Sequence, residues 1–126
     1  MLDVEVIGSA DLPQETVRRL VAIALASAGV EDGHLAVEFV DGERIAALNE
    51  QHRGVEGPTD VLSFPVDLDG EPVGERELGD VVIAPEHTED LTEALVHGTL
   101  HLVGMDHETD HGEMLALQAE IVSWVK

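Results

Sequence analysis

The chain has 126 residues, a length that fits one domain able to bury an apolar core without added cross-links. It contains no cysteine, which excludes disulfides and thiolate metal sites, so a transition metal would be held by the seven histidines and by carboxylates. Its 27 acidic and six basic residues give a formal charge of −21, which argues against a nucleic-acid binder, because phosphate binding normally uses clustered Lys and Arg.

The first half of the chain alternates strand and helix patterns. Its opening segment lacks the basic stretch and apolar block of a secretory signal, and no apolar run approaches the roughly 18 residues of a membrane span, so we expect a cytoplasmic protein without a membrane segment. Residues 3–7 and 34–39 predict strands, and residues 13–28 predict a helix with one apolar face. Asp41 is expected to cap a second helix that ends near Gly54.

The second half predicts two strands followed by two helices. Residues 61–64 and 80–83 are short apolar runs, each ended by a proline, and we expect them to be antiparallel neighbours. The acidic, Gly- and Pro-containing stretch 67–77 between them predicts an exposed, hairpin-like loop. Residues 92–103 and 110–124 have helical periodicity.

This order of elements predicts an α+β fold, in which a small mixed four-stranded sheet is packed with helices. We expect the whole chain, residues 1–126, to form a single domain. On the last helix we expect one face to be buried, consisting of Met114, Leu117, Ile121 and Trp124.

The informative motif is a set of three histidines at fixed spacing. His97 and His101 stand four residues apart on a predicted helix, about 5–6 Å apart at Cβ, so both rings can reach one zinc at about 2.0–2.1 Å. Gly104 ends that helix, and the reversed chain can return His107 as a third ligand. Three protein ligands leave one tetrahedral position for water, which is typical of catalytic zinc. We therefore predict one Zn²⁺ per chain, since all-imidazole ligation suits that ion.

The same spacing, His-x3-His-x2-Gly-x2-His, occurs in the metzincin proteases. Those proteases carry a glutamate directly after the first histidine, as general base. Here Gly98 takes that position and has no side chain to move a proton. Peptide hydrolysis by that route is therefore not expected.

The segment HGTLHLVGMDH, residues 97–107, resembles the signature of the YbeY family of bacterial metalloproteins. Two further blocks agree in the family's order, LNEQHRGVEGPTDVLSFP at residues 48–65 and LGDVVIAPE at residues 78–86. The resemblance implies an α+β fold and a zinc-dependent, single-strand-specific endoribonuclease. It also implies a role in ribosomal RNA maturation, at the 3′ end of 16S rRNA, and in ribosome quality control.

The resemblance implies a catalytic set that includes the three zinc ligands and consists of Arg53, His97, His101 and His107. Arg53 matches the family's invariant arginine, and a guanidinium can contact a phosphate with two parallel hydrogen bonds. The alternative is an exposed helix-end arginine near backbone carbonyls. The general base is open: Asp106 can act as the base or orient a ligating histidine, and Asp80 can orient one as well.

The expected partners are single-stranded RNA or rRNA and the ribosome or its proteins, and the oligomeric state is open. The alternative function is a ribosome-associated assembly factor whose metal is structural and which cleaves nothing. A third candidate is a hydrolase of small or peptide substrates. We assign no partner to the histidines at positions 34, 52 and 87, and expect Thr59, Asp60 and Ser63 to shape the loop and strand beside the site.

Overall fold

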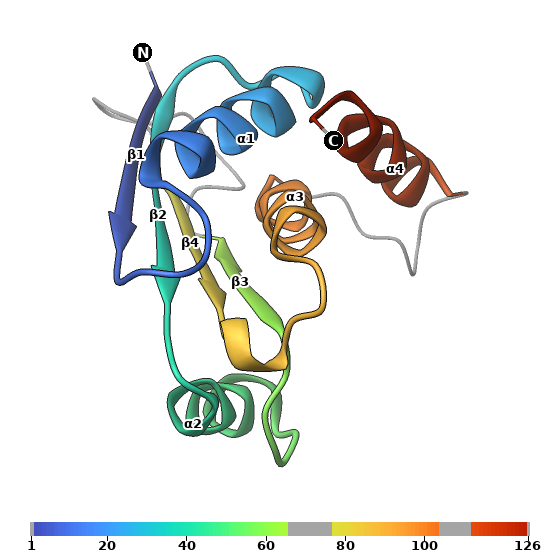
Figure 1. The fold of residues 1–126 in the computed structure, drawn as a ribbon. Coiled ribbons are helices and arrows are strands. Elements are labelled where there is room, and N and C mark those ends of the chain that lie inside the picture. Colours follow the sequence, from blue (N-terminus) through green and yellow to red (C-terminus); the bar gives the residue numbers. More distant parts are fainter. Residues whose placement is uncertain (1, 66–76, 104–111, 126) are drawn as a thin grey trace.

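The computed structural model of the chain describes residues 2–65, 77–103 and 112–125 (Figure 1). Its elements follow one another as β1 (Leu2–Ile7), α1 (Gln14–Ser27), β2 (Gly33–Phe39), α2 (Gly42–Arg53), β3 (Val61–Pro65), β4 (Glu77–Ile83), the 3₁₀ turn η1 (Pro85–His87), α3 (Leu91–Leu102) and α4 (Glu113–Val125). Except for Glu77, the stretch predicted as an acidic loop lies outside the described residues.

The four strands form one mixed sheet with the order β1-β2-β4-β3. β1, β2 and β4 run parallel, and β3 pairs antiparallel with β4. This arrangement confirms the predicted α+β class and the antiparallel pairing of the third and fourth strands. β4 begins three residues earlier than the apolar run predicted, at Glu77, because its first residues pair with β2 at the sheet's polar end.

The helix ends follow local signals in the sequence. Asp41 caps α2, and its side chain accepts a hydrogen bond from the backbone N–H of Arg44 at 2.8 Å. Gly54 ends the same helix in the left-handed conformation, at φ 69°, which favours glycine. Asp90 caps α3 by accepting from the backbone N–H of Glu93 at 3.1 Å.

Helices α1 and α3 cover one face of the sheet, and α2 lies at the end where β2 and β4 finish (Figure 1). The core between the sheet and these two helices is aliphatic apart from one phenylalanine, and consists of Val17, Leu20, Val21, Leu25, Leu35, Val37, Phe39, Leu78, Val81, Ile83, Leu95 and Leu102. Ile45 and Leu48 of α2 pack in a second cluster that includes Val82. Within the described ranges, no helix has the length and apolar character needed to cross a bilayer.

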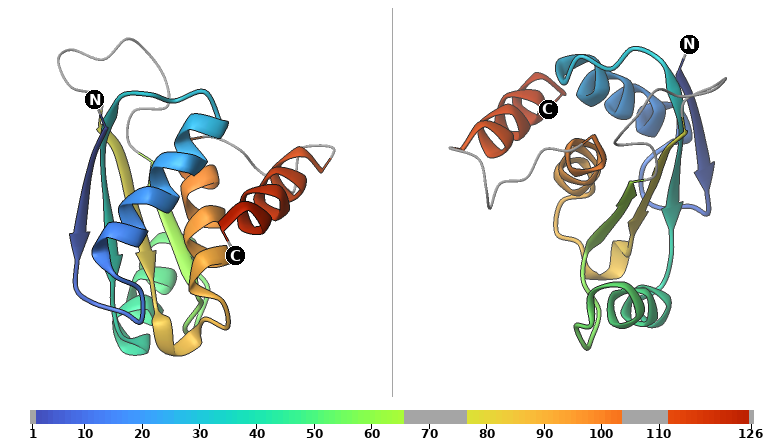
Figure 2. Two further views of the ribbon diagram at one scale, coloured as in Figure 1. Left: turned by 45° about the horizontal axis from the view of Figure 1, so that its top comes forward. Right: turned by 180° about the vertical axis from the view of Figure 1, so that it is seen from behind.

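Helix α4 lies on the outer side of α1 and α3 (Figure 2). Met114 and Ile121 are fully buried there in a cluster with Val96 and Leu100 of α3. The prediction that Trp124 shares this buried face is wrong, since 57% of the residue is exposed. At 100° per residue, Trp124 lies about 80° around the helix from Met114 and in the last turn, at the margin of the interface. Helix α3 therefore packs against the sheet on one side and against α4 on another, which leaves a third side for the site.

Candidate active site

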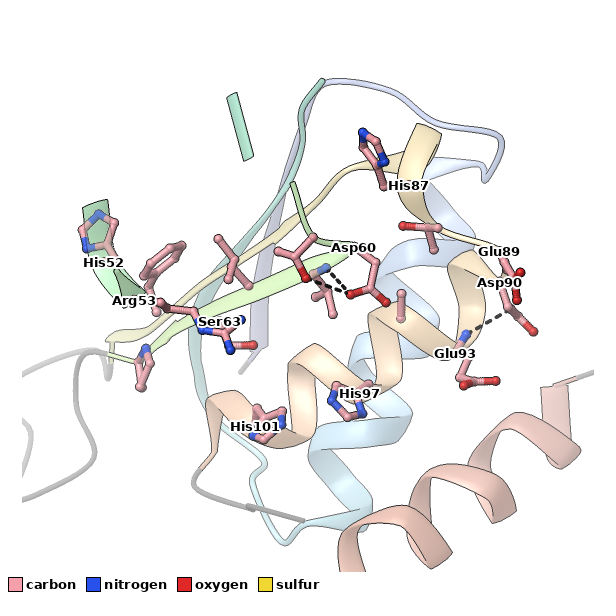
Figure 3. A pocket seen from close by; sticks show the side chains of 17 residues that line it. His52, Arg53, Asp60, Ser63, His87, Glu89, Asp90, Glu93, His97 and His101 are labelled. Atoms are coloured by element: carbon pink, nitrogen blue, oxygen red, sulfur yellow. Dashed lines mark hydrogen bonds between the residues drawn. The ribbon is translucent and has the colours of Figure 1, made fainter. Parts of the chain in front are cut away.

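A cleft of about 1190 Å³ opens beside the free side of α3 (Figure 3). It is lined by the end of α2, the approach to β3, β3 itself, the segment before α3 and one side of α3 from its first to its last turn, at residues 52–53, 59–65, 87–90, 93–94, 97 and 101. The structure thus brings Arg53, His97 and His101 together in one cleft. The third predicted ligand, His107, and the candidate base Asp106 lie outside the described residues.

The two histidines of α3 face the cleft from successive turns of the helix. Their ring centroids are 4.7 Å apart and the ring planes meet at 74°. This proximity follows from the i, i+4 spacing on a helix. Both side chains are partly buried, so they are accessible from the cleft and restrained by their surroundings.

Gly98 lets this helix approach the sheet closely. A Cβ atom at position 98 would lie 2.7 Å from Val81 Cγ1 and 2.8 Å from Val61 Cγ2, too close for carbon atoms. The hydroxyl of Ser63 donates to the Gly98 carbonyl at 2.7 Å and ties β3 to α3. Position 98 therefore faces the sheet, and packing explains the glycine where the metzincins have their base.

Gln118 of α4 was missed in the sequence analysis. The residue is 8% exposed, and its Oε1 lies 2.7 Å from Nδ1 of His97. An amide oxygen only accepts hydrogen bonds, so Nδ1 is the protonated nitrogen and a neutral His97 has its ring lone pair on Nε2. The available signal was a polar residue on the otherwise apolar stripe of the last helix, between Met114 and Ile121.

Two histidines without an assigned partner also line the cleft. The ring of His52 contacts that of Phe64 edge-on, with centroids 4.9 Å apart. His87 lies in η1 at the far end of the lining (Figure 3). Arg53 extends from the end of α2 toward the side of α3 that carries the histidines (Figure 3). The sequence placed these residues in different elements, and the fold brings them to one cavity.

Helix α2 is attached to its surroundings at both ends. At its start, the Glu86 side chain of η1 accepts a hydrogen bond from the backbone N–H of Gly42, and a Cβ on Gly42 would overlap Glu86 and His87. Near its end, the buried Asn49 donates to the carbonyl of Gly57 at 2.9 Å and so holds the loop that leads to β3. These contacts fix the helix that carries Arg53 relative to both cleft walls.

The charges of the cleft are unevenly placed. Among its described lining residues, Arg53 is the one side chain with a permanent positive charge. Glu89, Asp90 and Glu93 gather at the other end, before and within the first turn of α3 (Figure 3). Asp60 lies between the two ends. An anionic group is therefore favoured near Arg53 and disfavoured near the start of α3.

Asp80 does not take part in this site. It alternates along β4 with Val81, so it points to the face of the sheet opposite α3, and the prediction that it orients a ligating histidine is wrong for His97 and His101. Burial raises the pKa of Asp80, and nearby Glu77 adds to the effect. On the same polar face, Glu77 accepts a hydrogen bond from His34 Nδ1 at 2.9 Å and raises the pKa of that imidazole.

The residues present fit part of the predicted zinc site. His97 and His101 supply two neighbouring imidazoles on the cleft, and Gln118 leaves the lone pair of a neutral His97 on Nε2, where a metal can bind. Over residues 2–65, 77–103 and 112–125, no group of three His, Asp or Glu side chains is arranged to hold a metal ion. A third ligand would come from outside these ranges, where the predicted ligand His107 lies.

Comparisons with known proteins agree on one family. A family model described as "Endoribonuclease YbeY" matches residues 5–126. Proteins named "Endoribonuclease YbeY" include one from Geobacillus kaustophilus, 40% identical with 86% of this chain and 84% of that protein aligned. Another, from Rubrobacter xylanophilus, is 40% identical over 97% of this chain and 92% of its own length. The solution structure of TM1509 from Thermotoga maritima superimposes with a TM-score of 0.60 at 27% identity, and covers 95% of this chain and 87% of that one. The chain belongs to the Endoribonuclease YbeY family.

Proposed function

We propose that the protein is a zinc-dependent endoribonuclease, specific for single strands, that works in the cytoplasm as one domain. The names of its relatives support the reaction class. The observation that carries the proposal is that Arg53 shares one cleft with His97 and His101. At about 1190 Å³ this cleft exceeds the usual 300–1,000 Å³ of a small-molecule pocket, so it has room for more than one nucleotide.

Each residue has a distinct task in the proposed reaction. His97, His101 and His107 would hold zinc, which when bound polarises a phosphoryl oxygen and makes water more acidic. Arg53 seats the scissile phosphate through two parallel hydrogen bonds and stabilises the charge that grows on its oxygens. Asn49, through the loop after α2, keeps Arg53 opposite the histidines.

Metal content and RNA cleavage of matched variants test this assignment. We expect about one zinc per chain in the wild type and loss of both zinc and cleavage in His97→Ala. Arg53→Ala is expected to keep its zinc and to cleave single-stranded RNA about 10²–10³-fold more slowly, because a donor to the transition state is lost. Arg44→Ala is the control, since Arg44 lies exposed on α2 outside the cleft lining. Full activity of Arg53→Ala, or of the zinc-free protein, would overturn the proposal.

We also propose ribosomal RNA as the substrate, at the 3′ end of 16S rRNA, with the ribosome or its proteins as partners in maturation and quality control. A chain with a formal charge of −21 repels free RNA at long range, so a partner that presents the RNA removes that barrier. The measurement is cleavage of precursor 16S rRNA, naked and within small-subunit particles, at equal RNA concentration. Faster cleavage in the particle is expected, and equal or faster cleavage of naked RNA would contradict the proposal.

The competing function is an assembly factor with a structural metal. The two aliphatic clusters around α3 close without any metal ligand, which favours a fold that survives chelation. Circular dichroism during titration with a chelator is expected to show retained helix and strand signals while cleavage is lost. Unfolding on chelation would favour the structural role, because the metal would then supply folding free energy.

A further inference from the structure

Gln118 is a polar residue in an apolar interface. It lies on the face of α4 that packs on α3 and α1, between Met114 and Ile121, which are both fully buried. With 8% of its surface exposed, its amide would cost stability there unless it were hydrogen-bonded. Its Oε1 meets this need by accepting a hydrogen bond from Nδ1 of His97, at 2.7 Å. The residue is thus buried for a specific contact.

His97 lies at the boundary between two sides of α3. Its neighbour Val96 packs toward α4, whereas Ala94 and His101 line the cleft, as His97 itself does. One edge of the ring therefore bonds to α4 while the ring also forms part of the cleft wall. The ring of His101 contacts that of His97, with 4.7 Å between the centroids, so the hydrogen bond that orients His97 also limits the movement of His101.

We propose that Gln118 is a positioning residue, which fixes the tautomer and the ring orientation of His97 so that the Nε2 lone pair is available at the cleft. The use of that lone pair as a zinc ligand rests on the proposed function. The hydrogen bond that one ring nitrogen makes decides which nitrogen can bind a metal, so this contact prepares the ligand before the metal arrives. Helix α4 is thereby a part of the site, although the described cleft lining contains none of its residues.

Two substitutions separate this role from a merely structural one. Gln118→Met keeps the length of the side chain and suits the apolar surroundings, but it cannot accept the Nδ1 proton. Gln118→Glu keeps an accepting oxygen at the same place. Ser123→Ala is the matched control on the same helix, because its exposed hydroxyl donates only to the carbonyl of Glu120 within α4.

The first readout is the His97 tautomer in metal-free, ¹⁵N-labelled protein, observed by long-range ¹H–¹⁵N NMR at about pH 8.5, where an ordinary imidazole is neutral. We expect the Nδ1–H form in wild type, Gln118→Glu and Ser123→Ala, and loss of that preference in Gln118→Met. A wild-type ring in the Nε2–H form, or an unchanged tautomer in Gln118→Met, would overturn the proposal.

The second readout is zinc affinity measured against a competing chelator. We expect Gln118→Met to bind zinc about 10–100-fold more weakly than the wild type, and Gln118→Glu to keep the wild-type affinity. Equal zinc affinity in wild type and Gln118→Met would refute the role toward the metal. If Gln118→Met loses helix content, the tautomer of the folded wild type decides, since an Nε2–H ring there overturns the proposal. Neither readout uses RNA, so failure of the ribonuclease assignment is distinguishable from failure of this proposal.

Discussion

The absence of a side chain at position 98 decides how close the histidine-bearing helix lies to the sheet. Val61 and Val81 are β-branched residues on two paired strands, so their methyl groups have little freedom to move away. The sequence alone suggested only that a proton-transferring side chain was missing. The packing shows that any side chain at this point would displace α3 and the two rings that it carries.

Gly98→Ala is therefore expected to destabilise the protein by about 1–2 kcal/mol, because overpacking outweighs the gain in helix propensity. Urea unfolding measures the change as a lower midpoint at constant slope. The same substitution in a Val81→Ala background is expected to cost less, since one of the two opposing methyl groups is then absent. A midpoint equal to or above that of the wild type would show that α3 has more room than the structure gives it.

The stability that the polar face of the sheet contributes depends on pH through His34. The hydrogen bond to Glu77 raises the pKa of His34 above 6.5, against an opposing effect of burial. Its contribution to stability is therefore complete below pH 6.5 and is lost as the pH rises through the folded-state pKa. Compared with His34→Gln, we expect the wild type to gain about 0.5 kcal/mol between pH 8.5 and pH 6, a small value because the pair is partly exposed.

Thermal unfolding of both proteins between pH 6 and pH 8.5 measures this difference. Added salt at about 0.5 M is expected to shrink it by screening the ion pair. If the stability of the wild type relative to His34→Gln increased as the pH rises, the assignment would be contradicted.

At the scale of elements, the cleft depends on how α3 docks on β3. The hydroxyl of Ser63 on β3 donates a hydrogen bond to the backbone carbonyl of Gly98 on α3. Ser63→Ala is expected to lower the free energy of unfolding by about 1 kcal/mol, the usual value for one hydrogen bond. Urea unfolding provides the measurement, and Ser9→Ala, at an exposed position before α1, is expected to stay within about 0.5 kcal/mol of the wild type. A cost equal to that of Ser9→Ala would mean that the helix is held by apolar packing alone.

The elements themselves were largely predictable, because each carries its signal within a few residues. Asp41 and Gly54 mark the ends of α2, and the alternation along β2 reports which residues face the core. Trp124 was misplaced because periodicity gives the direction of a side chain but not the extent of the surface that it meets.

Local sequence patterns predicted the site only where its residues are close in sequence. His97 and His101 follow from helical spacing, and Arg53 was found by family resemblance. Gln118 is 21 residues from His97, and its contact depends on how α4 docks, which no local pattern encodes. The face to which Asp80 points could not be predicted, because its neighbours Val81 and Val82 are both apolar and the run shows no alternation; the structure buries them in different clusters.

For the whole molecule, charge limits how RNA can bind. If Arg53 and a bound metal are the phosphate anchors, as proposed, RNA binding is expected to release no more than about three counterions. For single strands this corresponds to a slope of log K against log salt concentration no steeper than about −2. Fluorescence anisotropy with labelled single-stranded RNA over a range of KCl concentrations measures it, and Arg53→Ala is expected to make the slope shallower by about 0.7. A slope steeper than −4 would reveal a cationic surface outside the cleft.

The uneven charge of the cleft also bears on the shape of the nucleic acid that it accepts. A backbone seated beside Arg53 meets Glu89, Asp90 and Glu93 if it continues along α3, so it has to bend away after a short distance. An unpaired strand makes such a bend at low energetic cost, because its backbone torsions are free. A double helix is stiff over lengths many times that of the cleft and cannot turn so sharply. For the single-strand specificity proposed above, four side chains at the two ends of one cavity thus supply a mechanical explanation, without any contact to a base.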